Sequence, residues 1–189
     1  MSTRDDRGAP SACAAAHGGA RTLGGVAEID AHLLQLDHAW EHVWESLTAA
    51  LDGVTQEEAF WQAPCYAGEE REEGWPPPGT IAWQLAHVTH CKRYYAAMCR
   101  QAGAPGPPDV VPWTPCATLA ELRAAVAGAH AEERAAIAAL GDERLGLTAG
   151  NGIPFREFVA GCVRHVTWHA SQIAVARRLY RARDPAEGL

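Results

Sequence analysis

The sequence has a single lysine, Lys92, and no run of basic residues, although it contains 189 residues and carries a formal net charge of -7. Without a basic patch, a nucleic-acid-binding function has little electrostatic support. No apolar stretch approaches the roughly 20 residues that are needed to span a bilayer. The N-terminal residues also lack the basic and then apolar order of a signal peptide. We therefore expect a cytoplasmic protein without a nucleic-acid or membrane partner.

The six cysteines contain no C-x-x-C pair and show no regular spacing. In a reducing compartment such cysteines are free thiols rather than disulfides. The sequence also lacks any segment with the alternation of a β-strand. These two absences argue against a disulfide-stapled domain and against a β-sheet fold.

Helical periodicity is present instead. Four long segments place apolar residues three or four apart, as amphipathic helices do. These predicted helices span residues 28–51, 81–101, 118–140 and 154–181. Pro- and Gly-rich connections join some of them, most clearly at residues 63–79 and 103–116. The pattern predicts an all-α fold, a four-helix bundle with long crossover loops, and bundle cores commonly hold metal sites.

The chain length favours a single domain with an ordinary hydrophobic core. Residues 1–25 are rich in small and polar residues without periodicity, which predicts a disordered N-terminal tail. We assign residues 26–182 to the bundle and residues 183–189 to a C-terminal tail.

Two histidine pairs have the four-residue spacing that stacks side chains on one face of a helix. His165 and His169 fall in the middle of the apolar arc of the last predicted helix. His38 and His42 project opposite the Leu/Trp stripe of the first predicted helix. The spacing alone is a weak signal, and the two pairs differ in direction. We expect the first pair in the core and the second in solvent.

A third inward histidine, His87, lies within the apolar arc of the second predicted helix. Buried imidazoles are costly unless they have partners, and one metal ion would satisfy several of them. We predict that His87, His165 and His169 bind a divalent transition metal. Three neutral imidazoles suit Zn²⁺ or Ni²⁺ first and Fe²⁺, Co²⁺ or Mn²⁺ as alternatives, and they leave positions open for water or substrate. The competing interpretation is packed histidines without a metal.

Other polar residues near the predicted core are candidates for supporting roles. His130 and Glu133 lie near the core line of the third helix, where they either orient a ligand imidazole or form a pair without a metal. Cys162 lies one turn before His165 and is either a soft ligand or a small hydrophobe. Glu133, His130 and His90 are also the candidates for a general base.

Three segments carry a resemblance that covers roughly residues 28–181. They are Thr80-Ile-Ala-Trp-Gln-Leu-Ala-His87-Val, Arg164-His165-Val-Thr-Trp-His169-Ala-Ser-Gln172-Ile and Gly53-Val-Thr-Gln-Glu-Glu-Ala. They are similar to the DinB/YfiT-like superfamily, whose members are four-helix bundles that hold a divalent metal. The resemblance implies that His87, His165 and His169 take the metal-ligand positions. It further implies a thiol S-transferase or isomerase, or a metal-dependent hydrolase, although many members have no known activity.

Two functions are therefore expected. The first is a metal-dependent hydrolase or thiol S-transferase that acts on a small molecule, with a low-molecular-weight thiol as a candidate cosubstrate. The alternative is a non-catalytic bundle whose metal has a structural or stress-related role. In an enzyme, Trp168 and Gln172 would shape the rim of the site. Residues 63–79 and 141–153 would form the entrance, with Trp75 as a substrate contact. A Trp-rich first helix makes a homodimer plausible.

Overall fold

The structure, a computed structural model, describes residues 27–42, 46–104, 106–109 and 112–183. Within these ranges the chain is helical and contains no β-strand, which confirms the predicted all-α class. The elements are α1 (Glu28–Trp40), α2 (Leu47–Leu51), α3 (Gln56–Phe60), η1 (Pro64–Tyr66), α4 (Ile81–Arg100), α5 (Leu119–Ala138), α6 (Gly141–Arg144) and α7 (Phe155–Ala182).

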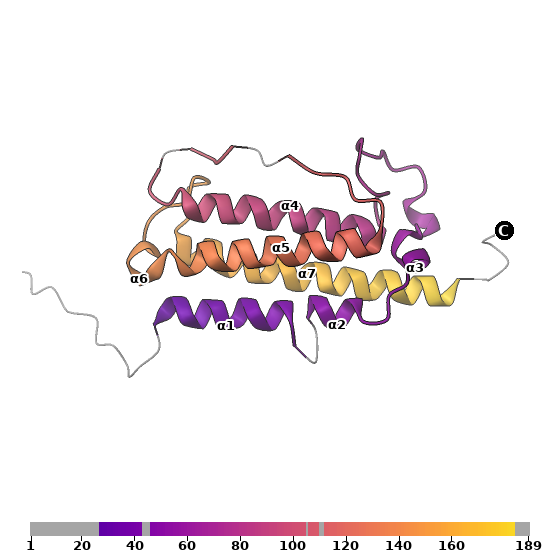
Figure 1. Cartoon of the computed structure of the whole chain (residues 1–189), viewed down its shortest axis with the longest axis horizontal. Helices are drawn as coiled ribbons and strands as arrows, with labels where there is room; N and C mark the ends of the chain where they lie inside the picture. The colour runs from indigo at the N-terminus through magenta and orange to yellow at the C-terminus, as the bar shows by residue number, and fades with distance from the viewer. Residues whose placement is uncertain (1–26, 43–45, 105, 110–111, 184–189) are drawn as a thin grey trace, which may run out of the picture.

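Four rods form the bundle, because α1 and α2 follow one another along one line beside α4, α5 and α7 (Figure 1). The connection after α4 runs back along the bundle, so that α4 and α5 point in the same direction (Figure 1). An ion pair agrees with this arrangement: Arg100, the last residue of α4, faces Glu132 in the second half of α5. The long crossover predicted at residues 103–116 is therefore what allows two consecutive helices to lie parallel.

The first predicted helix, residues 28–51, is not continuous, and this prediction was wrong. Helix α1 ends at Trp40 and α2 begins at Leu47, while residues 43–45 of the predicted span lie outside the described residues. The Ser46 hydroxyl oxygen accepts a hydrogen bond from the Ala49 N–H at 3.1 Å and so caps α2. A serine that satisfies a free N–H in this way favours a new helix start over continuation.

The other three long helices agree with their predicted ranges within two residues at each end. Pro154 directly precedes α7 as its N-cap instead of filling its first position. The predicted N-terminal tail lies outside the described residues, and so does the C-terminal tail apart from Arg183.

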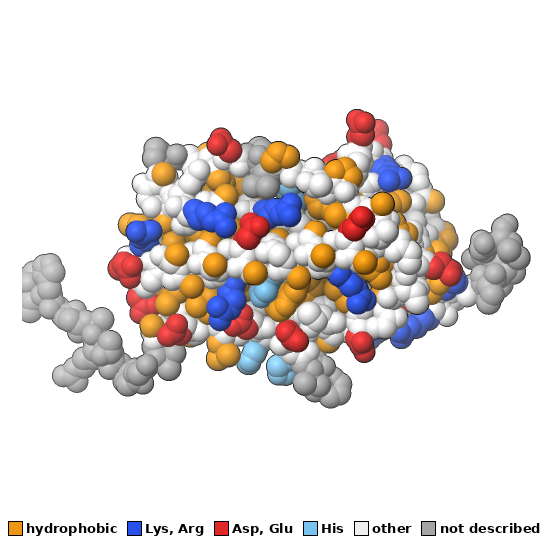
Figure 2. All heavy atoms as spheres, in the orientation of Figure 1, with side chains coloured by type: hydrophobic (Ala, Val, Ile, Leu, Met, Phe, Trp, Pro, Cys, Tyr) orange, Lys and Arg blue, Asp and Glu red, His pale blue; other side chains and the backbone are white. Residues whose placement is uncertain are grey.

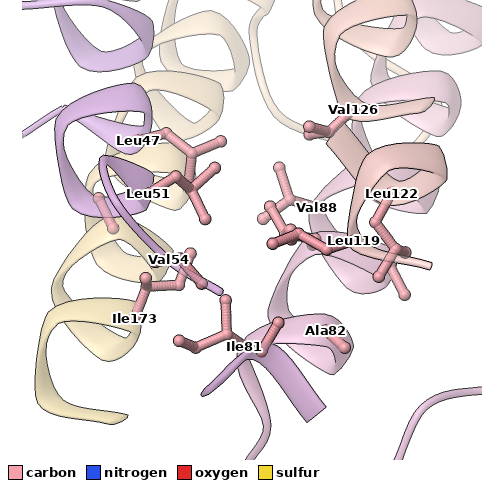
Figure 3. Close-up of a cluster of buried hydrophobic side chains, with 14 of the residues drawn as sticks. Leu47, Leu51, Val54, Ile81, Ala82, Val88, Leu119, Leu122, Val126 and Ile173 are labelled. Atoms are coloured by element: carbon pink, nitrogen blue, oxygen red, sulfur yellow. The ribbon is translucent and has the colours of Figure 1, made fainter. Parts of the chain in front are cut away.

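The interior consists of two neighbouring clusters of buried apolar side chains. One lies where α2, α4, α5 and α7 meet and includes Leu47, Val88, Leu122 and Ile173 (Figure 3). The other lies toward the α6 end of the bundle and is formed by α1, the ends of α4 and α5, the segment that follows α5 and the start of α7. The polar side chains described below lie on α4, α5 and α7, whose inner faces these clusters hold together.

Among the described residues, the exposed histidines are the two predicted to face solvent. His38 lies on α1 and His42 just beyond its end, and their ring centroids lie 5.1 Å apart. On the face drawn in Figure 2, acidic and basic side chains are interspersed without a large patch of one sign. Trp40, part of the reason for expecting a dimer, is partly buried and stacks on His130 with ring centroids 4.3 Å apart.

Candidate metal centre

The two histidines of α7 face the interior of the bundle, one turn apart. His169 is 5% exposed and His165 is partly buried. Their Nε2 atoms lie 3.1 Å from each other. Cys162, about one turn before His165, and Ile173, one turn after His169, are also buried. The helical periodicity therefore gave the correct direction for this pair.

His87 reaches the same point from α4. Its Nε2 atom lies 3.3 Å from the His165 Nε2 atom, and its ring centroid lies 4.8 Å from that of His169. Trp83 stacks on the His87 ring with an interplanar angle of 11°, which holds the imidazole in this orientation. The three histidines selected from the sequence are thus brought together by two helices that are far apart in the chain.

All three imidazoles are held in the neutral form near pH 7. Burial is the main cause in each case, because it disfavours a charged ring. Burial, followed by the neighbouring His165 and His87, lowers the pKa of His169 to about 3. Burial and His87 lower the pKa of His165 to about 4. Burial, followed by His90, lowers the pKa of His87. Neutral rings are the form that binds metals.

Gln84 orients the innermost histidine, and the sequence-based prediction had not included it. Its Oε1 atom lies 2.5 Å from the Nδ1 atom of His169. An amide oxygen accepts a hydrogen bond, so His169 carries its proton on Nδ1 and directs the Nε2 lone pair toward the other two rings. The spacing of the sequence could have identified Gln84 as a neighbour of the site, since it lies one turn before His87 on the same face of α4.

A thiol also lies beside the histidines. The Cys91 Sγ atom is 3.4 Å from the His87 Nε2 atom, and Cys91, His87 and His165 together form a group whose ligand atoms are close enough to hold one metal ion. Without a metal, burial raises the pKa of this thiol to about 11. The sequence-based prediction considered Cys162 instead, which is buried beside Glu133.

The distances from the His165 nitrogen to those of His87 and His169 fit ligands of one metal ion. A tetrahedral ion with Zn–N bonds of about 2.0–2.1 Å holds its nitrogen ligands roughly 3.3–3.4 Å apart, and octahedral geometry brings adjacent ligands to roughly 3.0 Å. The observed Nε2 separations of 3.1 Å and 3.3 Å lie within that range. Neutral imidazole nitrogens joined by a nearby sulfur are a donor set that suits a divalent transition metal.

The residues predicted as supporting partners form a separate buried cluster. Lys92 and Glu133 are both 0% exposed, and the Lys92 ammonium lies 2.5 Å from a Glu133 carboxylate oxygen. The same ammonium lies 3.3 Å from the Nδ1 atom of His130. His130 and Glu133 are therefore joined through Lys92, an arrangement that the sequence-based prediction had not included. His90, the third candidate base, meets the edge of the Trp75 ring.

Two hollows flank Trp168, which is 63% exposed. A groove of about 500 Å³ reaches His165 and is bordered by Asn151 and Ile153, which come from the predicted entrance segment 141–153. A smaller cavity of about 230 Å³ is bordered by Tyr66, Gly79 and Gln172. Trp168 borders both hollows, whereas Gln172 borders only the smaller cavity, which none of the three histidines lines.

The predicted substrate contact Trp75 packs against another loop. Its ring stacks on Trp113 with centroids 4.9 Å apart, and the Trp113 indole N–H donates to the Gly74 carbonyl at 3.0 Å. These contacts tie the two long connections together beside His90 of α4.

The helical fold and the convergence of histidines from two helices place this protein in the class of candidate metal-binding helical bundles. The family model described as the DinB superfamily matches residues 39–173, a span that contains all three histidines and Cys91. The chain therefore belongs to the DinB superfamily. No curated protein and no solved structure gives a significant match to it. Among the described residues, no helix is both long and apolar enough to cross a membrane.

Proposed function

We propose that His87, His165 and His169 bind one divalent transition metal, with Zn²⁺ or Ni²⁺ as the first candidates, and that the protein is a metal-dependent enzyme acting on a small molecule. The observation that supports this proposal best is the convergence of the three histidines beside a groove that His165 itself borders. A centre that a substrate can reach is typical of catalytic metal sites, whereas structural sites are closed by protein ligands.

The reaction class is hydrolysis or thiol transfer. A divalent metal bound to these nitrogens would lower the pKa of a coordinated water or thiol and so supply a nucleophile near neutral pH. The protein contributes the orientation: Gln84 fixes the tautomer of His169, and Trp83 fixes the ring plane of His87. A low-molecular-weight thiol is the proposed cosubstrate for the transfer reaction.

The groove provides groups that can hold a polar substrate. Arg164 and Asn151 border it, and a guanidinium binds carboxylate groups in a bidentate way. Tyr95 borders the groove as well, and burial raises the pKa of its phenol, which therefore stays protonated and can donate a hydrogen bond. These side chains would place a carboxylate-bearing thiol or ester beside His165.

The proposal is tested by measuring consumption of several low-molecular-weight thiols with a chlorinated arene, and hydrolysis of simple esters, with Zn²⁺- or Ni²⁺-loaded protein. We expect the His165→Ala variant to lose any such rate by at least about 100-fold, because the metal loses one of its ligands. His38→Ala, an exposed histidine of α1, is the control and should retain the rate. Equal rates in the two variants, or no metal in the wild-type protein after loading, would contradict the proposal.

A structural metal site is the second candidate, and Cys91 is the observation that favours it. Its sulfur is as close to His87 as a fourth ligand would be. Three histidines and one cysteine would complete a tetrahedral Zn²⁺ site and leave no position for substrate. The protein would then be a non-catalytic bundle that the metal stabilises.

Cobalt substitution separates the two candidates. If Cys91 stays outside the coordination sphere, the Co²⁺-loaded wild-type protein and its Cys91→Ser variant should have the same near-ultraviolet spectrum and metal affinity. A thiolate-to-cobalt charge-transfer band that disappears in Cys91→Ser would identify a closed site and favour the structural role. Cys99→Ser is the control, because that buried cysteine of α4 packs in the apolar cluster at the other end of the bundle.

A further inference from the structure

The cavity of about 230 Å³ lies on the opposite side of Trp168 from the groove. One wall is a face of α7, on which Trp168, Val175 and Leu179 are spaced by seven and four residues and therefore point the same way. Its inner end is Gln84, the residue that contacts His169. A molecule in this cavity would thus lie one side chain away from the histidines.

The wall opposite α7 is held in place by specific local structure. Gln62 donates hydrogen bonds to the Tyr66 carbonyl at 3.2 Å and to the Pro78 carbonyl at 2.9 Å, which pins both ends of the 66–78 segment. Gly79 has a φ of +76°, and a Cβ atom at this position would overlap the Tyr66 ring. A glycine is therefore required both for the backbone conformation and for the close approach of the ring. Tyr66 is positioned as a wall of the cavity by these contacts.

The chemistry of the lining is neutral and mainly apolar. None of the described residues that border the cavity carries a charge, whereas the groove is bordered by Arg164 and Glu157. Trp168, Val175, Leu179 and Tyr66 are large apolar side chains that are each more than a third exposed. The amide of Gln84, which borders the cavity, uses its oxygen on His169.

We infer that this cavity is a binding site for a neutral, apolar small molecule about the size of one substituted ring. Size supports this class of ligand, since an apolar cavity of about 150 Å³ already holds benzene. Charge supports it too, because none of the described residues that border the cavity offers a charged ligand an opposite charge in return for the hydration it would lose. The inference rests on the proposed function, in which the apolar part of the substrate binds in the cavity and its polar partner binds in the groove.

The test uses benzyl alcohol as a neutral probe, with benzoate and benzylammonium as charged probes of the same shape. Binding is measured by ligand-observed NMR titration on full-length protein with and without Zn²⁺. We expect benzyl alcohol to bind and both charged probes to bind at least about tenfold more weakly. Binding to the metal-free protein tests the cavity even if the protein binds no metal. Conversely, the absence of probe binding would not affect the measurement of metal binding.

Variants locate the binding. Val175→Glu and, independently, Leu179→Glu should each weaken benzyl alcohol binding at least about tenfold, because each places a carboxylate in the apolar wall. Leu34→Glu is the matched control: Leu34 on α1 is 57% exposed, Val175 is 53% exposed, and Leu34 does not border the cavity. The inference is overturned if the charged probes bind as tightly as benzyl alcohol, or if the three glutamate variants bind it equally.

Discussion

Replacing His169 with Ala is expected to abolish metal binding. The side chain is 5% exposed, its Nε2 atom lies 3.1 Å from that of His165, and Gln84 fixes its orientation. Its removal leaves two imidazoles, one from each helix, and breaks the pair that α7 presents as a unit. We expect the variant to purify without stoichiometric metal and to bind added Zn²⁺ or Ni²⁺ at least about 100-fold more weakly than the wild-type protein.

Thermal unfolding gives the clearest measurement of this loss. A metal at about 1,000 times its dissociation constant stabilises a native protein by about 4 kcal/mol. For a domain of this size that corresponds to a rise in Tm of roughly 8–16 °C. We expect this rise for the wild-type protein and no rise for His169→Ala. Comparing each protein with its own metal-free form removes any direct effect of the substitution on the fold.

His38→Ala is the matched control for His169→Ala. His38 and His42 have the same four-residue spacing as the α7 pair, but both are exposed, His38 on α1 and His42 just beyond its end. The control should keep the full metal-induced rise in Tm. Equal metal-induced shifts in the two variants would refute the assignment of the site, because the argument depends on the direction of the helix face and not on the spacing.

The fold and the three central histidines could be predicted because both depend on helical periodicity. A helix face is set by the sequence in a window of a few turns, so the inward direction of His87, His165 and His169 follows from their apolar neighbours. The break between α1 and α2 was missed because the Leu/Trp stripe continues through it, while the N-cap of Ser46 acts locally.

The remaining site residues depend on contacts between helices, which one sequence does not specify. Gln84 and Cys91 share the face of His87, but only the packing of α4 against α7 shows that one contacts His169 and the other lies beside His87. No role was assigned to Lys92 from the sequence, because lysine is almost never fully buried unless it is paired. Its partner Glu133 lies 41 residues further along the chain.

The buried ion pair leads to the second large prediction. Replacing Lys92 with Met is expected to lower the free energy of unfolding at pH 7 by about 3–5 kcal/mol, because Glu133 is left buried without its cation. The double variant Lys92→Met/Glu133→Leu should recover most of this loss, since an apolar pair of similar volume removes the uncompensated charge. Urea unfolding of the metal-free proteins, followed by circular dichroism, measures all of these differences without a contribution from metal binding.

An exposed pair between the same two helices provides the control. Arg100 and Glu132 lie 3.9 Å apart, and their side chains are 55% and 48% exposed. Arg100→Met should therefore lower the free energy of unfolding by less than about 1 kcal/mol. A Lys92→Met variant as stable as Arg100→Met, or a double variant no more stable than Lys92→Met, would show that the buried pair does not determine the stability of this part of the bundle.

The effect of Lys92→Met should also depend on pH. Burial raises the pKa of the Glu133 carboxyl above its usual value, and Lys92 opposes that shift. Without Lys92 the pKa rises further, so the folded variant keeps a proton on Glu133 that the unfolded chain releases above a pH of about 4.5. The folded state then binds more protons than the unfolded state, and its stability falls as the pH increases through this window. The destabilisation caused by Lys92→Met should consequently be smaller at pH 5 than at pH 7, whereas that caused by Arg100→Met should show no such increase.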